Sequence, residues 1–336
     1  MAISSALGSS ALLPAGLGFR NVLINGDFKV WQRGTSITVT SGSPYTADRW
    51  CVTAGGTANF SASRQTASLD GFQYCLRFQR TASNTNTSAL YLSQPVETVN
   101  SVPLANKQVS FSFYARAGTN FSAASSALNV RIVTGTGTDG NYLAATLTGQ
   151  AFQLDTTATL TTSWRRFTYS VLIPSGVNQV QPVFFYTPVG TAGAADYVEF
   201  TGVQLEQNSQ PTPFEQRPIG VELALCQRYY EISNGLVQVT GGATGFGGNT
   251  YWSWVGYKVE KRIALNLVTN NTSNGVRVFA TDGGSDYITM YKAATQYYSV
   301  AENFEAWTTQ GFSINTTSGQ TDAGLGRFYW NANAEL

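Results

Sequence analysis

The sequence predicts an all-β protein with an N-terminal β-sandwich, a connecting helix and a second, smaller C-terminal β domain. Three observations predict this fold: short segments alternate apolar and polar residues, turn residues separate these segments, and aromatic residues are abundant, with 17 tyrosines and 19 phenylalanines. Alternation with a period of two is the pattern of a sheet that has one buried face. The length of 336 residues corresponds to about two domains.

The first domain is predicted over residues 21–213. Residues 108–116 alternate Val, Phe, Phe and Ala with Ser, Ser, Tyr and Arg, and residues 166–173 repeat the pattern before a Pro-Ser-Gly turn. Short strands separated by turns are typical of a two-sheet sandwich. Further strands are predicted at residues 23–31, 74–78, 89–92, 128–133, 183–186 and 197–206.

The last of these strands changes its parity. Val198 and Phe200 alternate in one register, whereas Val203 and Leu205 alternate in the other, and Gly202 lies at the change. A β-bulge at Gly202 would return the later residues to the core face.

A helix is predicted within the connecting segment 214–231. Its apolar residues at helical spacing are Ile219, Leu223, Cys226 and Tyr230. Pro218 suits the first helical position. A second apolar stripe, which includes Val221 and Leu225, indicates that the helix packs between the two domains and is covered on more than one side.

The second domain is predicted over residues 232–336 and is again all-β. Residues 263–268 and 328–335 alternate as strands, and glycine pairs mark the loops.

The composition excludes several classes of function. Histidine is absent, which removes Ser-His-Asp nucleophiles and His-ligated metal sites. Charged residues make up 12% of the chain and the net charge is +1, so no basic surface is available for nucleic acid. Cys51, Cys75 and Cys226 form no metal-binding pair and are predicted to be buried thiols, with a Cys51–Cys75 disulfide as the alternative.

The first 20 residues are predicted to be an attachment arm. They lack the positive start of a secretory signal, and Pro14 interrupts their short apolar run. No stretch of the chain is long and apolar enough for membrane insertion. The arm is too apolar for a solvated tail, so it is expected to order against another subunit or another protein. The alternative is a frayed terminus.

Several segments resemble a module common in virion proteins of tailed bacteriophages. The resemblance rests on Asn25-Gly26-Asp27-Phe28, Trp31-Gln32-Arg33-Gly34 and residues 45–50, 202–206, 212–218, 222–231 and 327–336. It touches both domains and covers most of the chain in pieces. It implies a virion structural protein without specifying its position in the particle.

The first domain also resembles the jelly rolls of carbohydrate-binding modules. Such modules open with an Asn-Gly-x-Phe element, and they carry a Phe-x-x-Tyr-Ala-Arg strand and a Trp-x-x-Phe strand. Residues 111–116 and 164–167 match the last two elements. The resemblance implies the fold more than a ligand, because many phage jelly rolls only space or attach neighbouring parts.

The candidate ligand-binding residues are aromatic. Sugar rings stack on aromatic faces, while amides and carboxylates hydrogen-bond their hydroxyl groups. Trp252 and Trp254 share one face of a predicted strand with Gly256, beside a glycine-rich loop. The alternative is that these side chains pack in the core or in a subunit interface. The predicted binding residues are Trp252, Trp254, Tyr257, Tyr297, Tyr298 and Trp307.

Neither a cofactor nor an enzymatic activity is predicted. Jelly rolls of the kind that the first domain resembles often hold a structural calcium ion, and the carboxylates available for one are Asp27, Asp196 and Glu199. The carboxylate pairs Asp282/Asp286 and Glu302/Glu305 lie in turn-like and polar segments, without the surroundings that would separate their pKa values.

These observations and the resemblance together predict a bacteriophage tail fibre component that attaches to the host surface by non-catalytic binding. Its predicted partners are itself, as a homotrimer, other virion proteins through residues 1–20, and a host cell-surface glycan or protein. It is expected to fold in the host bacterial cytoplasm and to be exposed on the virion. The alternative is a capsid decoration or head-fibre protein that cements or adorns the head.

Overall fold

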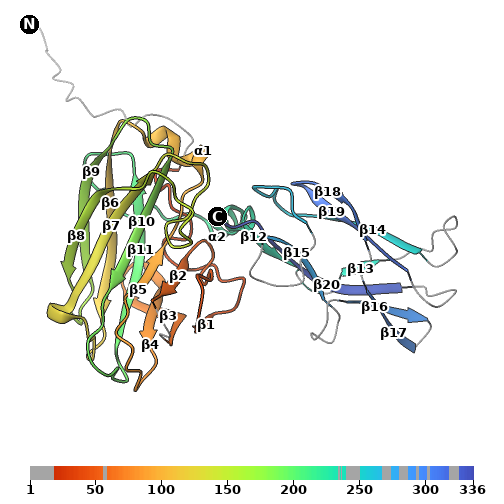
Figure 1. Cartoon of the computed structure of the whole chain (residues 1–336), viewed down its shortest axis with the longest axis horizontal. Coiled ribbons are helices and arrows are strands. Elements are labelled where there is room, and N and C mark those ends of the chain that lie inside the picture. Colours follow the sequence, from red (N-terminus) through yellow and green to blue (C-terminus); the bar gives the residue numbers. More distant parts are fainter. Residues whose placement is uncertain are drawn as a thin grey trace, which may run out of the picture.

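The computed structural model describes residues 19–55, 59–233, 235, 237–239, 250–266, 274–279, 287–292, 295–300, 303–317 and 325–336. Two β domains lie side by side in Figure 1, and a short helix lies between them. The predicted all-β class is therefore confirmed. In the described part of the chain, no helix is both long and apolar enough to cross a membrane.

The first domain is an antiparallel jelly-roll-type sandwich of two sheets (Figure 1). One sheet has the order β1 (Ser36–Val39), β3 (Phe60–Leu69), β4 (Phe72–Arg80), β11 (Tyr197–Glu206), β6 (Lys107–Ala117) and β9 (Arg165–Ile173). The other has the order β2 (Cys51–Ala54), β5 (Leu90–Ser93), β10 (Gln179–Tyr186), β7 (Ala127–Gly135) and β8 (Ala151–Thr159). The connections include α1 (Thr98–Ser101) and the 3₁₀ turns η1 (Val102–Leu104) and η2 (Ala124–Ser126).

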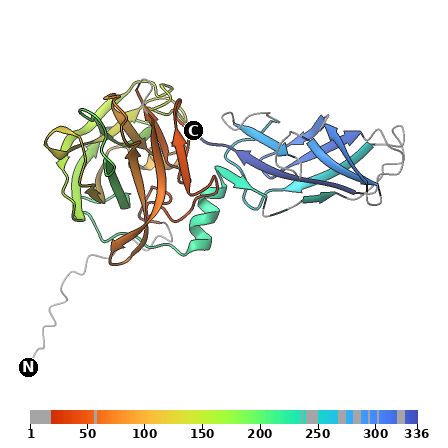
Figure 2. The ribbon, with the colours of Figure 1, turned by 90° about the horizontal axis from the view of Figure 1, so that it is seen from below.

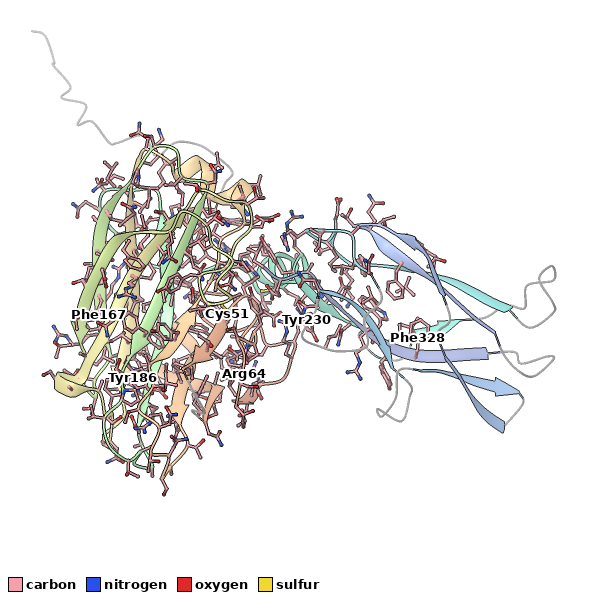
Figure 3. All side chains as sticks on the ribbon, viewed as in Figure 1. Cys51, Arg64, Phe167, Tyr186, Tyr230 and Phe328 are labelled. Atoms are coloured by element: carbon pink, nitrogen blue, oxygen red, sulfur yellow. The ribbon has the colours of Figure 1, made fainter. Side chains whose placement is uncertain are left out.

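Aromatic side chains from both sheets fill the core of this sandwich. The ring of Phe184 on β10 lies 4.7 Å from that of Phe113 on β6 and 4.8 Å from that of Phe200 on β11. Tyr186 is the last residue of β10 and is fully buried, and both it and Phe167 are labelled in Figure 3. The alternation seen in the sequence thus corresponds to one inward face on each sheet.

The predicted bulge at Gly202 is confirmed. The pairing of β11 with β6 shifts between Thr201 and Gln204, and Gly202 has a φ of +60°. A Cβ atom at Gly202 would lie 2.7 Å from Phe72 Cζ and 3.0 Å from Tyr114 Cδ2, so neither the conformation nor the space admits a side chain.

The strand predicted at 23–31 is wrong, because this segment folds as consecutive turns. Asn25 and Phe28 both have positive φ angles, which interrupt an extended chain. The side chain of Asn25 hydrogen-bonds both the N–H and the C=O of Val30, so it takes the place of a partner strand. The apolar residues are buried as the pattern predicted, but by turns.

The second domain is a smaller sandwich. Its larger sheet has the order β12 (Tyr230–Ile232), β20 (Leu325–Asn333), β16 (Tyr287–Lys292) and β17 (Thr295–Val300), and β13 (Val237–Val239) and β15 (Gly275–Phe279) also pair with β20. The other sheet has the order β14 (Thr250–Gly256), β19 (Gly311–Thr317) and β18 (Asn303–Trp307). Val255, Phe312, Phe328 and Trp330 pack between the two sheets.

The strand predicted at 263–268 is not present in its described part. Residues 263–266 lie outside any strand, and the remaining two positions lie outside the described residues. A single backbone hydrogen bond joins Asn266 to Val276. The neighbouring Arg262 donates hydrogen bonds to the carbonyls of Ala334 and Glu335, so contacts with the chain end hold this segment in place of a ladder.

The helix α2 (Ile219–Gln227) lies in the predicted connector, but only Cys226 and Tyr230 of the predicted apolar stripe are buried. Glu222, Cys226 and Gln227 are buried, whereas Ile219 is 58% exposed. Glu222 turns inward because its carboxylate accepts hydrogen bonds from the N–H of Asn25 and from Arg217.

The last residues of the chain join the two domains (Figures 1 and 2). Glu335 forms a buried ion pair with Arg49 of the first domain, and Arg33 lies 3.3 Å from the same carboxylate. The hydroxyl of Tyr45 donates a hydrogen bond to the carbonyl of Leu336 at 2.7 Å. Burial lowers the pKa of Arg49, but Glu335, Tyr229 and Tyr45 together raise it by more, so Arg49 stays charged.

The three cysteines are free and buried, as predicted. Burial raises the pKa of Cys51 and of Cys75 to about 12, and it raises that of Cys226 well above its usual range. Figure 3 labels Cys51 within the first domain, near the junction.

We expect Gly202→Ala to lower the free energy of unfolding by about 2–4 kcal/mol, because it adds a strained φ to a clash with two rings. Gly176→Ala is the control, since Gly176 has a similar φ of +79° but open space around it, and it should cost only about 1 kcal/mol. Urea denaturation measures both, and equal losses would contradict the packing argument.

We expect Glu335→Ala to destabilise the protein by about 3–5 kcal/mol, because Arg49 would be left buried without its counter-charge. Glu260→Ala, at an exposed carboxylate, should change stability by less than about 0.5 kcal/mol. Thermal and chemical denaturation would test this, and a loss of less than 1 kcal/mol for Glu335→Ala would show that the ion pair is dispensable.

Candidate functional site

An exposed tryptophan lies on the outer face of the three-stranded sheet. In β14, Val255 pairs with Phe312 and both side chains are buried in the core. Trp254 pairs with Ser313, and alternation along the strand turns its side chain away from the core. Trp254 is 53% exposed, although tryptophan is highly buried on average.

Two glycines form the bed on which the Trp254 ring lies. Gly256 and Gly311 pair with each other beside it. A Cβ atom on Gly311 would come within 2.6 Å of Trp254 Cζ2, and one on Gly256 would lie 3.8 Å from Nε1. The indole therefore covers the backbone of Gly311, and much of the ring remains in contact with solvent. A flat, exposed ring of this kind suits stacking against the apolar face of a sugar.

We call this platform the Trp254 face and define it as Trp254, Gly256, Gly311 and Ser313. Polar groups lie next to it, in the turn before Gly311. The turn that leads into Gly311 is fixed by the hydroxyl of Thr308, which accepts hydrogen bonds from the N–H groups of residues 310 and 311 at 3.1 Å. Thr308 and Gln310 are exposed. Hydroxyl and amide groups beside an exposed ring are the groups that recognise sugar hydroxyls.

The structure places the other predicted residues differently. Trp252 occupies a position on β14 opposite Asn315, and Trp307 on β18 is opposite Phe312; the side chains of both lie outside the described residues. Tyr297 and Tyr298 are on β17, in the other sheet, so the fold does not bring them to the sheet of Trp254. Their side chains also lie outside the described residues.

Tyr257 packs inward rather than beside Trp254. Its ring lies 5.9 Å from that of Phe312 and 5.7 Å from that of Trp330, both in the core of the second domain. Burial raises the pKa of its hydroxyl. Because neighbouring rings cover it, the Tyr257 ring packs against the core of the second domain and is not available for stacking on a ligand.

A second aromatic surface, which the sequence analysis did not identify, crosses the outer face of the first domain. Tyr91, Phe185, Arg131 and Phe152 follow one another on β5, β10, β7 and β8. The rings of Tyr91 and Phe185 stack at 5.1 Å, and the Arg131 guanidinium lies 4.4 Å and 4.6 Å from the ring centroids of Phe185 and Phe152. These contacts occupy the ring faces, so the row stabilises the sheet and offers mainly ring edges to a ligand.

A groove of about 700 Å³ lies at the junction of the two domains. Its walls include Arg33, Tyr45 and Asn141 of the first domain and Tyr230 and Glu335 of the second. Figure 3 labels Tyr230 at this junction, and the Arg33 guanidinium lies 3.5 Å from its ring centroid. The polar groups of Tyr45 and Asn141 already hold the carbonyl of Leu336, so the groove wall forms part of the interdomain contact.

The three predicted calcium ligands do not converge. Asp27 lies 2.9 Å from Lys29, Asp196 is paired with Arg80, and Glu199 is held between Arg77 and Arg116. Within the described residues, no three Cys, Asp or Glu side chains form a metal-binding group. These carboxylates therefore do not fit a calcium site.

The two carboxylate pairs of the sequence analysis lie mostly outside the described residues. Asp282, Asp286 and Glu302 lie outside the described residues, as does the side chain of Glu305.

No family model and no curated protein matches the chain. Among solved structures, the chain is similar to one described as "CBM4 structure and function", with 17% identity over 55% of this chain and 98% of that chain and a TM-score of 0.33. It is similar to the enzymatically active domain of tailspike protein 4 of bacteriophage CBA120, with 11% identity over 56% of this chain and 22% of that chain and a TM-score of 0.37. It is also similar to TmCBM61 in complex with β-1,4-galactotriose, with 15% identity over 56% of this chain and all of that chain and a TM-score of 0.34.

Proposed function

We propose that the protein is a non-catalytic attachment protein of a bacteriophage virion, a tail fibre component that binds glycans of the host surface through the Trp254 face. The observation that carries the binding proposal is the half-exposed Trp254 ring on its glycine bed. The indole covers the backbone of Gly311 and remains half exposed, so a sugar ring can stack on it without a rearrangement of the fold. The virion assignment rests on the sequence motifs that resemble phage structural proteins.

Binding in this proposal is reversible and involves no turnover. The indole stacks on a sugar ring, and neighbouring hydroxyl and amide groups hydrogen-bond the sugar hydroxyls. A single such contact is weak because few groups take part. A homotrimer would present three faces at once, and linked sites can raise the overall affinity by about 10²–10⁴. Other virion proteins would hold the assembly so that the Trp254 face points outward.

We expect Trp254→Ala to weaken binding to host-cell polysaccharide by about 30-fold, which corresponds to about 2 kcal/mol for the loss of a central aromatic contact. Adsorption of the purified full chain to host cells, and titration against the extracted polysaccharide, would measure the loss. Trp254→Phe should retain part of the affinity, because a smaller ring remains available for stacking.

Phe152→Ala is the matched control. Phe152 is 44% exposed, but it lies on the first domain, where its ring contacts the guanidinium of Arg131. The Phe152→Ala variant should bind the polysaccharide with an affinity within about twofold of that of the unmodified chain. Phe152 lies outside the Trp254 face, and even within an interface fewer than a third of the positions are energetically important. Equal losses in both variants would contradict a site at Trp254. Immunogold labelling of the head, with normal adsorption by particles that lack the protein, would contradict the tail fibre role.

A further inference from the structure

Helix α2 has an inverted distribution of side chains. Its polar residues Glu222 and Gln227 are buried, while Ile219 is 58% exposed and Val221 and Leu225 are only half-buried. A surface helix normally directs its apolar stripe to the core and its polar residues to water. This helix therefore leaves an apolar side uncovered.

That uncovered side forms a groove of about 400 Å³. It is lined by Gly220, Val221, Ala224, Leu225, Arg228 and Val259. The only charged group among them, Arg228, is held by the carboxylate of Glu97 at 2.7 Å. The groove thus offers an apolar surface without a free charge, and it suits an uncharged apolar segment.

The first residues of the chain form such a segment. Residues 1–18 carry no charged side chain and include Ile3, Leu12, Leu13 and Leu17. Eighteen residues span at most roughly 60 Å when extended, whereas a nine-residue helix is about 14 Å long. The segment is therefore long enough to reach beyond its own subunit and to fill a groove along α2.

The contacts of residues 19–25 show where on the subunit the described chain begins. Asn25 is bound to Glu222 on α2, and the ring of Phe19 lies 4.6 Å from the guanidinium of Arg217, which also pairs with Glu222. Asn21 and Arg20 both donate their N–H groups to Glu215, and Arg20 also contacts Thr212. The described chain thus starts beside residues 212–217, just before α2 begins.

We propose that residues 1–18 of a neighbouring copy fill the apolar groove of α2, and that this head-to-tail contact builds the homo-oligomer. The same arm and the same groove exist on every copy, so head-to-tail contacts between copies can close a ring. In the proposed homotrimer this ring has three such contacts. The inference rests on the proposed assembly into a homotrimer and is independent of glycan binding at Trp254. It also accounts for the inverted burial of α2, because the exposed side becomes an interface.

Two variants of the full chain test this contact. Leu225→Asp places a charge in the groove, and the double variant Leu12→Asp/Leu13→Asp places charges in the arm. We expect each to weaken self-association by at least about 100-fold, because a carboxylate would be buried in an apolar contact without a partner. Light scattering with size-exclusion chromatography should give the mass of a monomer for each variant alone and that of a trimer for the unmodified chain.

Mixing the two variants gives a sharper test. The groove variant retains an intact arm and the arm variant retains an intact groove, so an equimolar mixture should form a dimer with one restored contact. Leu172→Asp is the control, because Leu172 is 55% exposed on β9 and lies in neither element; it should keep the mass of the unmodified chain. Circular dichroism verifies that each variant is folded.

Three results would overturn the proposal: a monomeric unmodified chain, an arm variant that keeps the full mass, or a mixture that stays monomeric. The second result would mean that another part of a neighbouring copy covers α2. Polysaccharide binding of the monomeric variants reports separately on Trp254, since each monomer retains one Trp254 face.

Discussion

The buried contact between Glu335 and Arg49 holds the two domains of this protein in one arrangement. Removing two charges from water is costly, and the cost is offset only when the remaining hydrogen bonds are satisfied. Here the Arg49 guanidinium also donates to the carbonyl of Pro95 and lies 3.6 Å from the ring of Tyr229. The end of β20 is therefore fixed in the first domain, and the positions of α2 and of the Trp254 sheet follow from it.

The protein places about half of its acidic residues in the interior. The chain has 19 acidic residues, and at least nine of them are buried, most of them beside an arginine or a lysine. These nine are Asp27, Asp48, Glu97, Asp196, Glu199, Glu206, Glu222, Glu231 and Glu335. Because these charges are paired inside the fold, neutral polar and aromatic groups make up much of the outer surface. Such a surface favours short-range contacts over long-range electrostatic attraction.

Local patterns predicted much of this structure, and long-range contacts account for the rest. Alternation identified most long strands of the first domain, and the change of parity identified the bulge at Gly202. Alternation also placed Trp252 and Trp254 on one face of a strand, but it did not decide whether that face is exposed or packs in the core or in a subunit interface. The same reasoning misread residues 23–31, because the side chain of Asn25 supplies the hydrogen bonds of a missing partner strand. The junction groove could not be predicted, since its walls come from segments some 300 residues apart, such as Arg33 and Glu335.

The buried thiols have a consequence for the redox chemistry of the protein. A cysteine with a pKa of about 12 holds roughly one thiolate per 10⁵ molecules at neutral pH, and only the thiolate attacks a disulfide or an alkylating reagent. Burial raises the pKa of both Cys51 and Cys75 to about 12, and the packed sandwich covers their side chains. Oxidising and reducing surroundings therefore leave the same covalent molecule, and no redox step is needed between folding and use.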